Sequence, residues 1–81
     1  MNIYLLTQDV NVDWDTYDSA IVCAESEAEA VKFHPDGTFF DSMWRAKCDW
    51  TKTSSDVKCK KIGVADKSIE KGVILASFNA G

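Results

Sequence analysis

The sequence predicts one small α+β domain, in which a four-stranded, mainly antiparallel sheet carries a single helix on one face. Three observations predict this fold. Two stretches with strand character precede a helix-start signal at Ser26, and two more follow it, which gives the order β-β-α-β-β. The chain has 81 residues, of which 46% are hydrophobic and one is a proline. This size and composition suit a single domain spanning residues 1–81.

Residues 3–7 and 17–24 are the first two predicted strands. The first is a short apolar run with β-branched and aromatic members. The second alternates, which places Tyr17 and Ile21 on one side and Ala20 and Val22 on the other. Residues 9–16 between them are polar and rich in turn formers, and are too many for a tight turn. We therefore expect an antiparallel hairpin with a wide acidic tip.

A helix is predicted to begin after Ser26. Ser26 and Glu29 form a capping box, in which the serine hydroxyl accepts from the N–H of residue 29 and the glutamate reaches back to the N–H of residue 26. The helix is expected to continue to Phe33 and to place Ala30 and Phe33 against the sheet. It should stop there because Pro35 disfavours helical geometry at the residue before it.

The second half of the chain supplies the last two strands. Residues 57–62 indicate an exposed strand whose lysines discourage pairing at a sheet edge, and residues 73–78 indicate an apolar strand. Residues 38–40 are compatible with a further strand, and residues 41–50 with either a short helix or an ordered loop. Residues 51–56 have the composition of a loop.

Charge is distributed unevenly along a chain whose net charge is −4. Residues 1–41 hold nine of the 13 acidic residues and one of the nine basic residues. Either the two halves form an acidic and a basic side, or strand pairing mixes them and neutralises them locally.

Composition also bears on the compartment. The three cysteines are widely spaced and odd in number, which favours reduced thiols, and no apolar run is long enough to span a bilayer. The N-terminus lacks the features of a signal peptide. We expect a cytoplasmic protein that does not act at a membrane.

The residue pattern offers little for catalysis or for a cofactor. Asp9, Asn11, Asp13 and Asp15 alternate like the start of a calcium loop. The glycine and the glutamate that such a loop needs are replaced by Trp14 and Ala20. His34 is the only histidine and is expected to cap the last turn of the helix. We expect no metal, no cofactor, no catalytic residue and no enzymatic activity.

Several segments resemble a set of short proteins from bacteriophages and prophages. The resemblance lies in residues 3–7, 15–27, 34–37 and 72–81, and it is vague between residues 38 and 56. It implies a phage gene expressed in the cytoplasm of a host bacterium. Small acidic phage proteins often bind host machinery, as anti-CRISPR and other anti-defence inhibitors do, and the resemblance carries no catalytic residue to this chain.

The leading functional hypothesis is therefore an inhibitor that binds a host defence protein. The expected contact surface is the acidic hairpin tip, where carboxylates surround two aromatic side chains: Asp9, Asp13, Trp14, Asp15, Tyr17 and Asp18. Such a surface would engage a basic partner, for example a nucleic-acid-binding defence effector, with no direct contact to nucleic acid. Trp14 either anchors this contact or folds back as a lid on the core. The chain would act as a monomer or small homo-oligomer.

An alternative hypothesis belongs to a different class. A homo-oligomer would bind a small ligand, such as a nucleotide signal, in a pocket lined by Trp44, Trp50 and nearby lysines.

Overall fold

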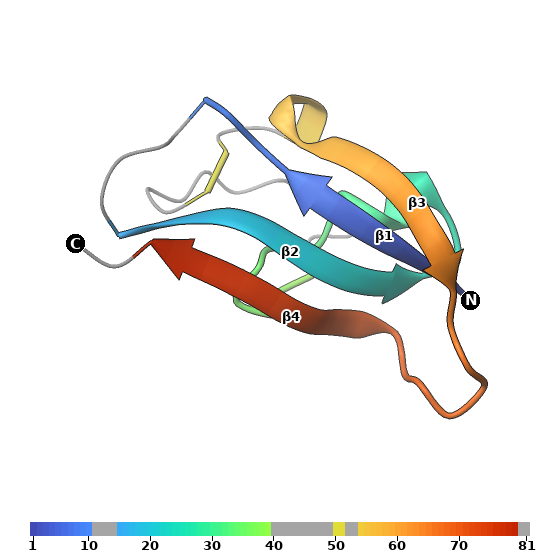
Figure 1. The fold of residues 1–81 in the computed structure, drawn as a ribbon. Helices are drawn as coiled ribbons and strands as arrows, with labels where there is room; N and C mark the ends of the chain where they lie inside the picture. The colour runs from blue at the N-terminus through green and yellow to red at the C-terminus, as the bar shows by residue number, and fades with distance from the viewer. Residues whose placement is uncertain (11–14, 40–49, 52–53, 80–81) are drawn as a thin grey trace.

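The computed structural model describes residues 1–10, 15–39, 50–51 and 54–79. These described residues form four strands, one α-helix and one 3-10 helix, with bounds β1 Asn2–Thr7, β2 Thr16–Ala24, α1 Glu27–Ala30, η1 Ser54–Asp56, β3 Lys58–Val64 and β4 Gly72–Asn79. The strands form one antiparallel sheet in the order β3-β1-β2-β4, and α1 lies behind it in the view of Figure 1. The predicted α+β fold with the order β-β-α-β-β is confirmed.

The central pair of strands sorts its side chains onto two faces. Tyr4 lies opposite Val22, and all four residues of the pairs Tyr4–Val22 and Leu6–Ala20 are buried. Residues directly opposite each other in an antiparallel pair share a face. This face is the core face, because α1 and the residues that follow it cover it (Figure 1). Leu5 and Ile21 lie opposite each other on the other face, called the open face below, and are half-buried.

The alternation of β2 is interrupted at Asp18. Tyr17 pairs with Phe78 and Ser19 pairs with Ser77, so Asp18 is an extra residue in the strand. Uninterrupted alternation would place Tyr17 on the face of Ile21. Tyr17 instead packs against the core cluster, so this part of the expected pattern is wrong. A bulge shifts every side chain beyond it to the other face.

The helix begins as expected and ends earlier. Ser26 Oγ accepts from the backbone N of Glu29 at 3.2 Å, which confirms the N-cap. Glu29 Oε1 accepts from the backbone N of Glu25 at 2.9 Å, where the capping box predicted the N–H of residue 26. The helix stops at Ala30, with Val31 as its C-cap, and does not extend to Phe33.

The early end of α1 has a physical reason in residues 33–39. Phe33 forms an isolated antiparallel bridge with Phe39, and the backbone N of His34 donates to the O of Thr38 at 2.8 Å. An antiparallel bridge needs extended backbone at Phe33, so the helix cannot continue to this residue. Gly37, at φ 99°, allows the chain to reverse between Phe33 and Phe39. Of the strand considered for residues 38–40, the described residues 38–39 hold one bridge at Phe39, and residue 40 lies outside the described part of the chain. A short helix or an ordered loop was expected for residues 41–50, of which residues 41–49 lie outside the described residues.

The core lies between the sheet and this covering segment. Leu6, Val22, Ala30 and Phe33 are buried there, and among the described residues Trp50 is the largest fully buried side chain. The expected burial of Ala30 and Phe33 is confirmed. Among the helices of the described residues, none has the length and apolar character to cross a membrane.

Candidate protein-binding site

The end of the β1–β2 hairpin is held by one buried side chain. Gln8 is 6% exposed and follows the last residue of β1. Its Nε2 donates to the backbone O of Tyr17 at 2.9 Å, and its Oε1 accepts from the backbone N of Val10 at 3.0 Å. Because both ends of the amide are used, the two strands keep a fixed spacing where the predicted acidic tip begins.

Asp9 lies on the β3 side of the hairpin end. Its Oδ2 accepts from Lys58 Nζ at 2.8 Å, and both side chains are 67% exposed. The hydrogen bond and the positive charge of Lys58 lower the pKa of Asp9. The Asp9 carboxylate is therefore already paired with the ammonium group of Lys58.

Asp15 and Asp18 lie on the other side of the hairpin end, next to β4. The backbone N of Asp15 donates to the O of Asn79 at 2.6 Å, and Asp15 has a φ of 60°. Aspartate is one of the few residues that adopts this left-handed region without glycine's freedom. Asp18 is exposed in the bulge of β2, and its Oδ1 accepts from Ser19 Oγ at 3.0 Å. Two solvent-exposed carboxylates thus flank Tyr17.

Tyr17 is part of a row of aromatic rings that runs from the core to the surface. Its ring meets Phe78 edge-on at 4.8 Å and His34 edge-on at 5.6 Å, and His34 lies 6.4 Å from Trp50. His34 and Trp50 are each 1% exposed, whereas Phe78 is 46% exposed. Edge-to-face geometry at these distances is favourable for aromatic pairs. The buried end of the row therefore holds its exposed end in place.

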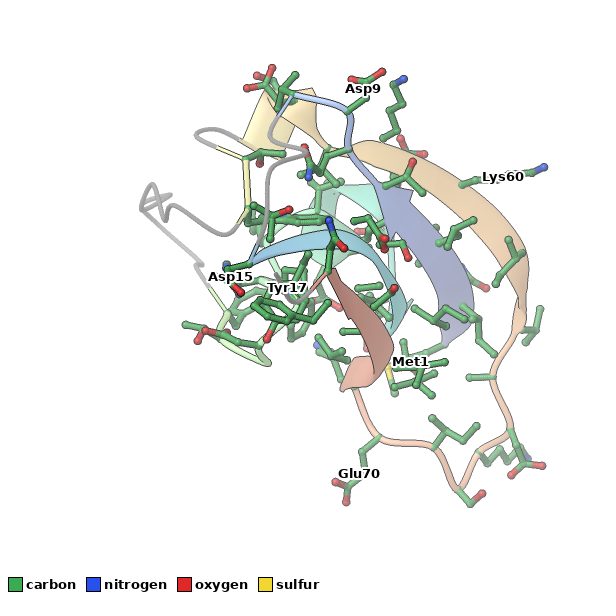
Figure 2. All side chains as sticks on the ribbon, turned by 60° about the vertical axis from the view of Figure 1, so that its left-hand side comes forward. Met1, Asp9, Asp15, Tyr17, Lys60 and Glu70 are labelled. Atoms are coloured by element: carbon green, nitrogen blue, oxygen red, sulfur yellow. The ribbon has the colours of Figure 1, made fainter. Side chains whose placement is uncertain are left out.

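The structure brings together some of the predicted contact residues and separates another. Asp15, Tyr17 and Asp18 lie together next to β4, and Asp9 lies apart beside β3 (Figure 2). Asp13 and Trp14 lie outside the described residues, as does the central part of the calcium-like spacing. We call Asp15, Tyr17, Asp18 and Phe78 the acidic aromatic patch.

Phe78 was not among the residues predicted for this surface. It is 61 positions away from Tyr17 in the chain and meets it only because β4 pairs with β2. The apolar pattern of residues 73–78 predicted a strand and did not indicate its neighbour. Only the knowledge that the second strand pairs with the fourth would have placed Phe78 beside Tyr17.

His34 does not cap the helix as expected. Its Nδ1 accepts from the backbone N of Asp36 at 2.9 Å and lies 3.0 Å from the Asp36 carboxylate. The imidazole therefore fixes the turn at residues 34–37. In the described ranges no group of three or more His, Cys, Asp or Glu side chains is arranged to hold a metal ion.

The expected ligand pocket is not built around Trp50, whose side chain is packed into the core. Trp44 lies outside the described residues. Of the three cysteines, Cys23 and Cys59 are described and are free thiols. Burial, with a smaller effect of Glu27, raises the pKa of Cys59 to about 11, so its thiol is protonated at neutral pH.

The acidic and basic halves of the chain meet at two described places. Lys58 pairs with Asp9, and Lys71 Nζ donates to Glu29 Oε2 at 3.0 Å. Each pair joins one residue from the acidic half to one from the basic half. The fold therefore mixes the charges locally at these positions, through strand pairing for Asp9 and Lys58 and through a contact with α1 for Lys71.

Comparison of the chain with models of protein families, with curated proteins and with solved structures finds no match.

Proposed function

We propose that this chain is a phage accessory protein that binds and inhibits a host protein through the acidic aromatic patch. The observation that carries this proposal is the edge-on pair of Tyr17 and Phe78 at the surface, flanked by the exposed carboxylates of Asp15 and Asp18. Binding surfaces commonly combine a rigid aromatic anchor with a charged rim.

The patch suits a partner with a basic surface. Carboxylates that face a positive patch speed the encounter of two proteins, and an aromatic ring then supplies the buried contact. Asp15 and Asp18 flank the aromatic pair and would contribute to this attraction, whereas Asp9 lies apart from them beside Lys58. A nucleic-acid groove of a defence effector, such as a CRISPR complex, is a surface of this kind.

The aromatic pair is suited to the role of anchor because little entropy is lost when it binds. Tyr17 is held by Phe78 on one side and by the buried His34 on the other. A side chain whose rotamer is already fixed costs less to immobilise at an interface.

The test compares two doubly neutralised variants in capture from host lysate at low and high salt. D15N/D18N removes two negative charges from the patch. Asparagine also adopts the left-handed backbone region, so the fold at Asp15 should be kept. E25Q/E70Q removes two negative charges elsewhere; Glu25 precedes α1, and Glu70 lies at the other end of the sheet (Figure 2).

We expect wild-type protein to retain a host protein that high salt releases. D15N/D18N should lower this capture roughly tenfold or more, as expected for an electrostatically steered contact. E25Q/E70Q should capture as wild type does. Equal losses in the two variants, or none in D15N/D18N, would contradict a role for the patch.

A further inference from the structure

The two edge strands of the sheet differ in charge. β3 carries Lys58, Lys60 and Lys61, whereas the sequence of β4, GVILASFN, contains no charged residue. Lysines on an edge strand discourage pairing with another chain, and an uncharged apolar edge lacks this protection. Each edge strand also has one extra residue in its pairing, Ile62 in β3 and Ile74 in β4, so these irregularities do not distinguish the two edges. The difference in charge does distinguish them.

β4 exposes large apolar side chains along this edge. Ile74 is 46% exposed, Leu75 is 64% exposed and Phe78 is 46% exposed. β4 pairs with β2 on its inner side, and no other described strand lies on its outer side. An edge strand presents a row of backbone N–H and C=O groups to whatever lies next to it.

The apolar surface continues from β4 onto the open face. Leu75 lies opposite Ile21, which lies opposite Leu5, so the three side chains share this face. They line a shallow groove of about 220 Å³ together with Ser19 and Ser77, and none of the described residues that line it is charged. The edge and the groove beside it thus form one uncharged surface.

We propose that β4 is a dimerisation strand, and that its occupant is β4 of a second copy of this chain. A strand that brought charges to this surface would have to desolvate them without a partner of opposite sign. The chain's own β4 brings none over its eight residues. Two copies related by a two-fold axis would pair antiparallel through identical surfaces and extend the sheet to eight strands.

Antiparallel pairing centred near Leu75 places Phe78 of one copy opposite Gly72 of the other, inside the interface. Phe78 also belongs to the acidic aromatic patch, so a second copy and the host protein proposed above would compete for this side chain. Lys71, which directly precedes β4, is paired with Glu29 of its own copy and adds no free charge to the interface.

The test measures the dimer by sedimentation velocity over roughly a hundredfold range of protein concentration. L75K places a charge near the axis on a side chain that is already exposed, so the fold of each copy should be kept. I62K is its matched control, because Ile62 is 49% exposed on the other edge strand. Circular dichroism verifies that each variant is folded.

We expect the wild-type protein and I62K to form dimers as concentration rises, and L75K to weaken the dimer at least tenfold. An equal mixture of L75K and L75E should restore it, because opposite charges then meet near the axis. A wild-type protein that stays monomeric throughout would overturn the proposal. So would open-ended assembly, equal weakening by I62K, or failure of the mixture to recover.

Discussion

The Glu29 carboxylate joins three parts of the chain. Its Oε1 accepts from the backbone N of Glu25, its Oε2 accepts from Lys71 Nζ, and its own backbone N is capped by Ser26. The bond from Glu25 and then that from Lys71 lower the pKa of Glu29. A carboxylate whose pKa is lowered on folding stabilises the folded state above its unfolded pKa, and this stabilisation is lost as the pH falls through the folded pKa.

Replacing Glu29 by glutamine should therefore destabilise the protein in a pH-dependent way. E29Q keeps an oxygen that can accept from Glu25 and removes the charge that pairs with Lys71. We expect a loss of about 0.5–1 kcal/mol in the free energy of unfolding at neutral pH, typical of a partly exposed ion pair with helix-end interactions. Wild type and E29Q should converge in acid, below the folded pKa of Glu29.

Urea unfolding at neutral and at acidic pH measures this difference. E70Q is the control, since Glu70 is an exposed carboxylate in the connection between β3 and β4. It should unfold like the wild type at both pH values. A loss in E29Q that is as large in acid as at neutral pH would show that the charge of Glu29 is not its cause.

Single residues also show what sequence could and could not predict. Ser26 and Glu29 predicted the start of α1 because a capping box is a local pattern. The pairing of Asp9 with Lys58 spans 49 positions and depends on β3 lying beside β1. No sequence pattern near Asp9 or Lys58 indicates that the two residues meet. The sequence therefore grouped Asp9 with Asp15, Tyr17 and Asp18, from which the structure separates it.

At the scale of elements, the four strands were predictable and their order was not. Alternation and apolar runs are properties of one segment, and they located all four strands. The order β3-β1-β2-β4 puts the last strand beside the second and the third beside the first. This arrangement brings Phe78 to Tyr17 and leaves β4 at an edge. Both surfaces proposed above depend on it.

The two faces of β1 can be compared by making the same substitution at two neighbouring positions and measuring the loss of stability. Leu6 is fully buried on the core face, and its neighbour Leu5 is half-buried on the open face. L6A should cost about 2–5 kcal/mol because it leaves a cavity in a packed core. L5A removes the same atoms from a surface that water already reaches, so its cost should be clearly smaller.

Chemical denaturation of L6A and L5A at equal and low protein concentration compares the faces without a contribution from a dimer. Because the substitution is identical at adjacent positions, each variant serves as the control for the other. Equal losses in the free energy of unfolding would mean that the open face is covered as thoroughly as the core face.

At the scale of the whole molecule, a small core depends on few large side chains. Natural domains gain roughly 0.05–0.15 kcal/mol of stability per residue, so a chain of this length has about 4–12 kcal/mol. Among the described residues Trp50 is the largest fully buried side chain, and it lies far along the chain from the β1 and β2 residues with which it shares the core cluster. It therefore adds a side-chain contact between distant parts of the chain to the strand pairing that already joins them.

Removing the Trp50 side chain should consequently lower the free energy of unfolding of the whole domain, and not only that of one element. A buried tryptophan replaced by alanine costs about 3–5 kcal/mol, which is a large part of the stability expected for a domain of this size. We expect W50A to lose at least a third of the wild-type free energy of unfolding, and W50F, which keeps an aromatic ring beside His34, to lose less. Urea titration followed by far-UV circular dichroism measures both variants. If W50A unfolds within about 1 kcal/mol of the wild type, the remaining core side chains hold the fold without this indole.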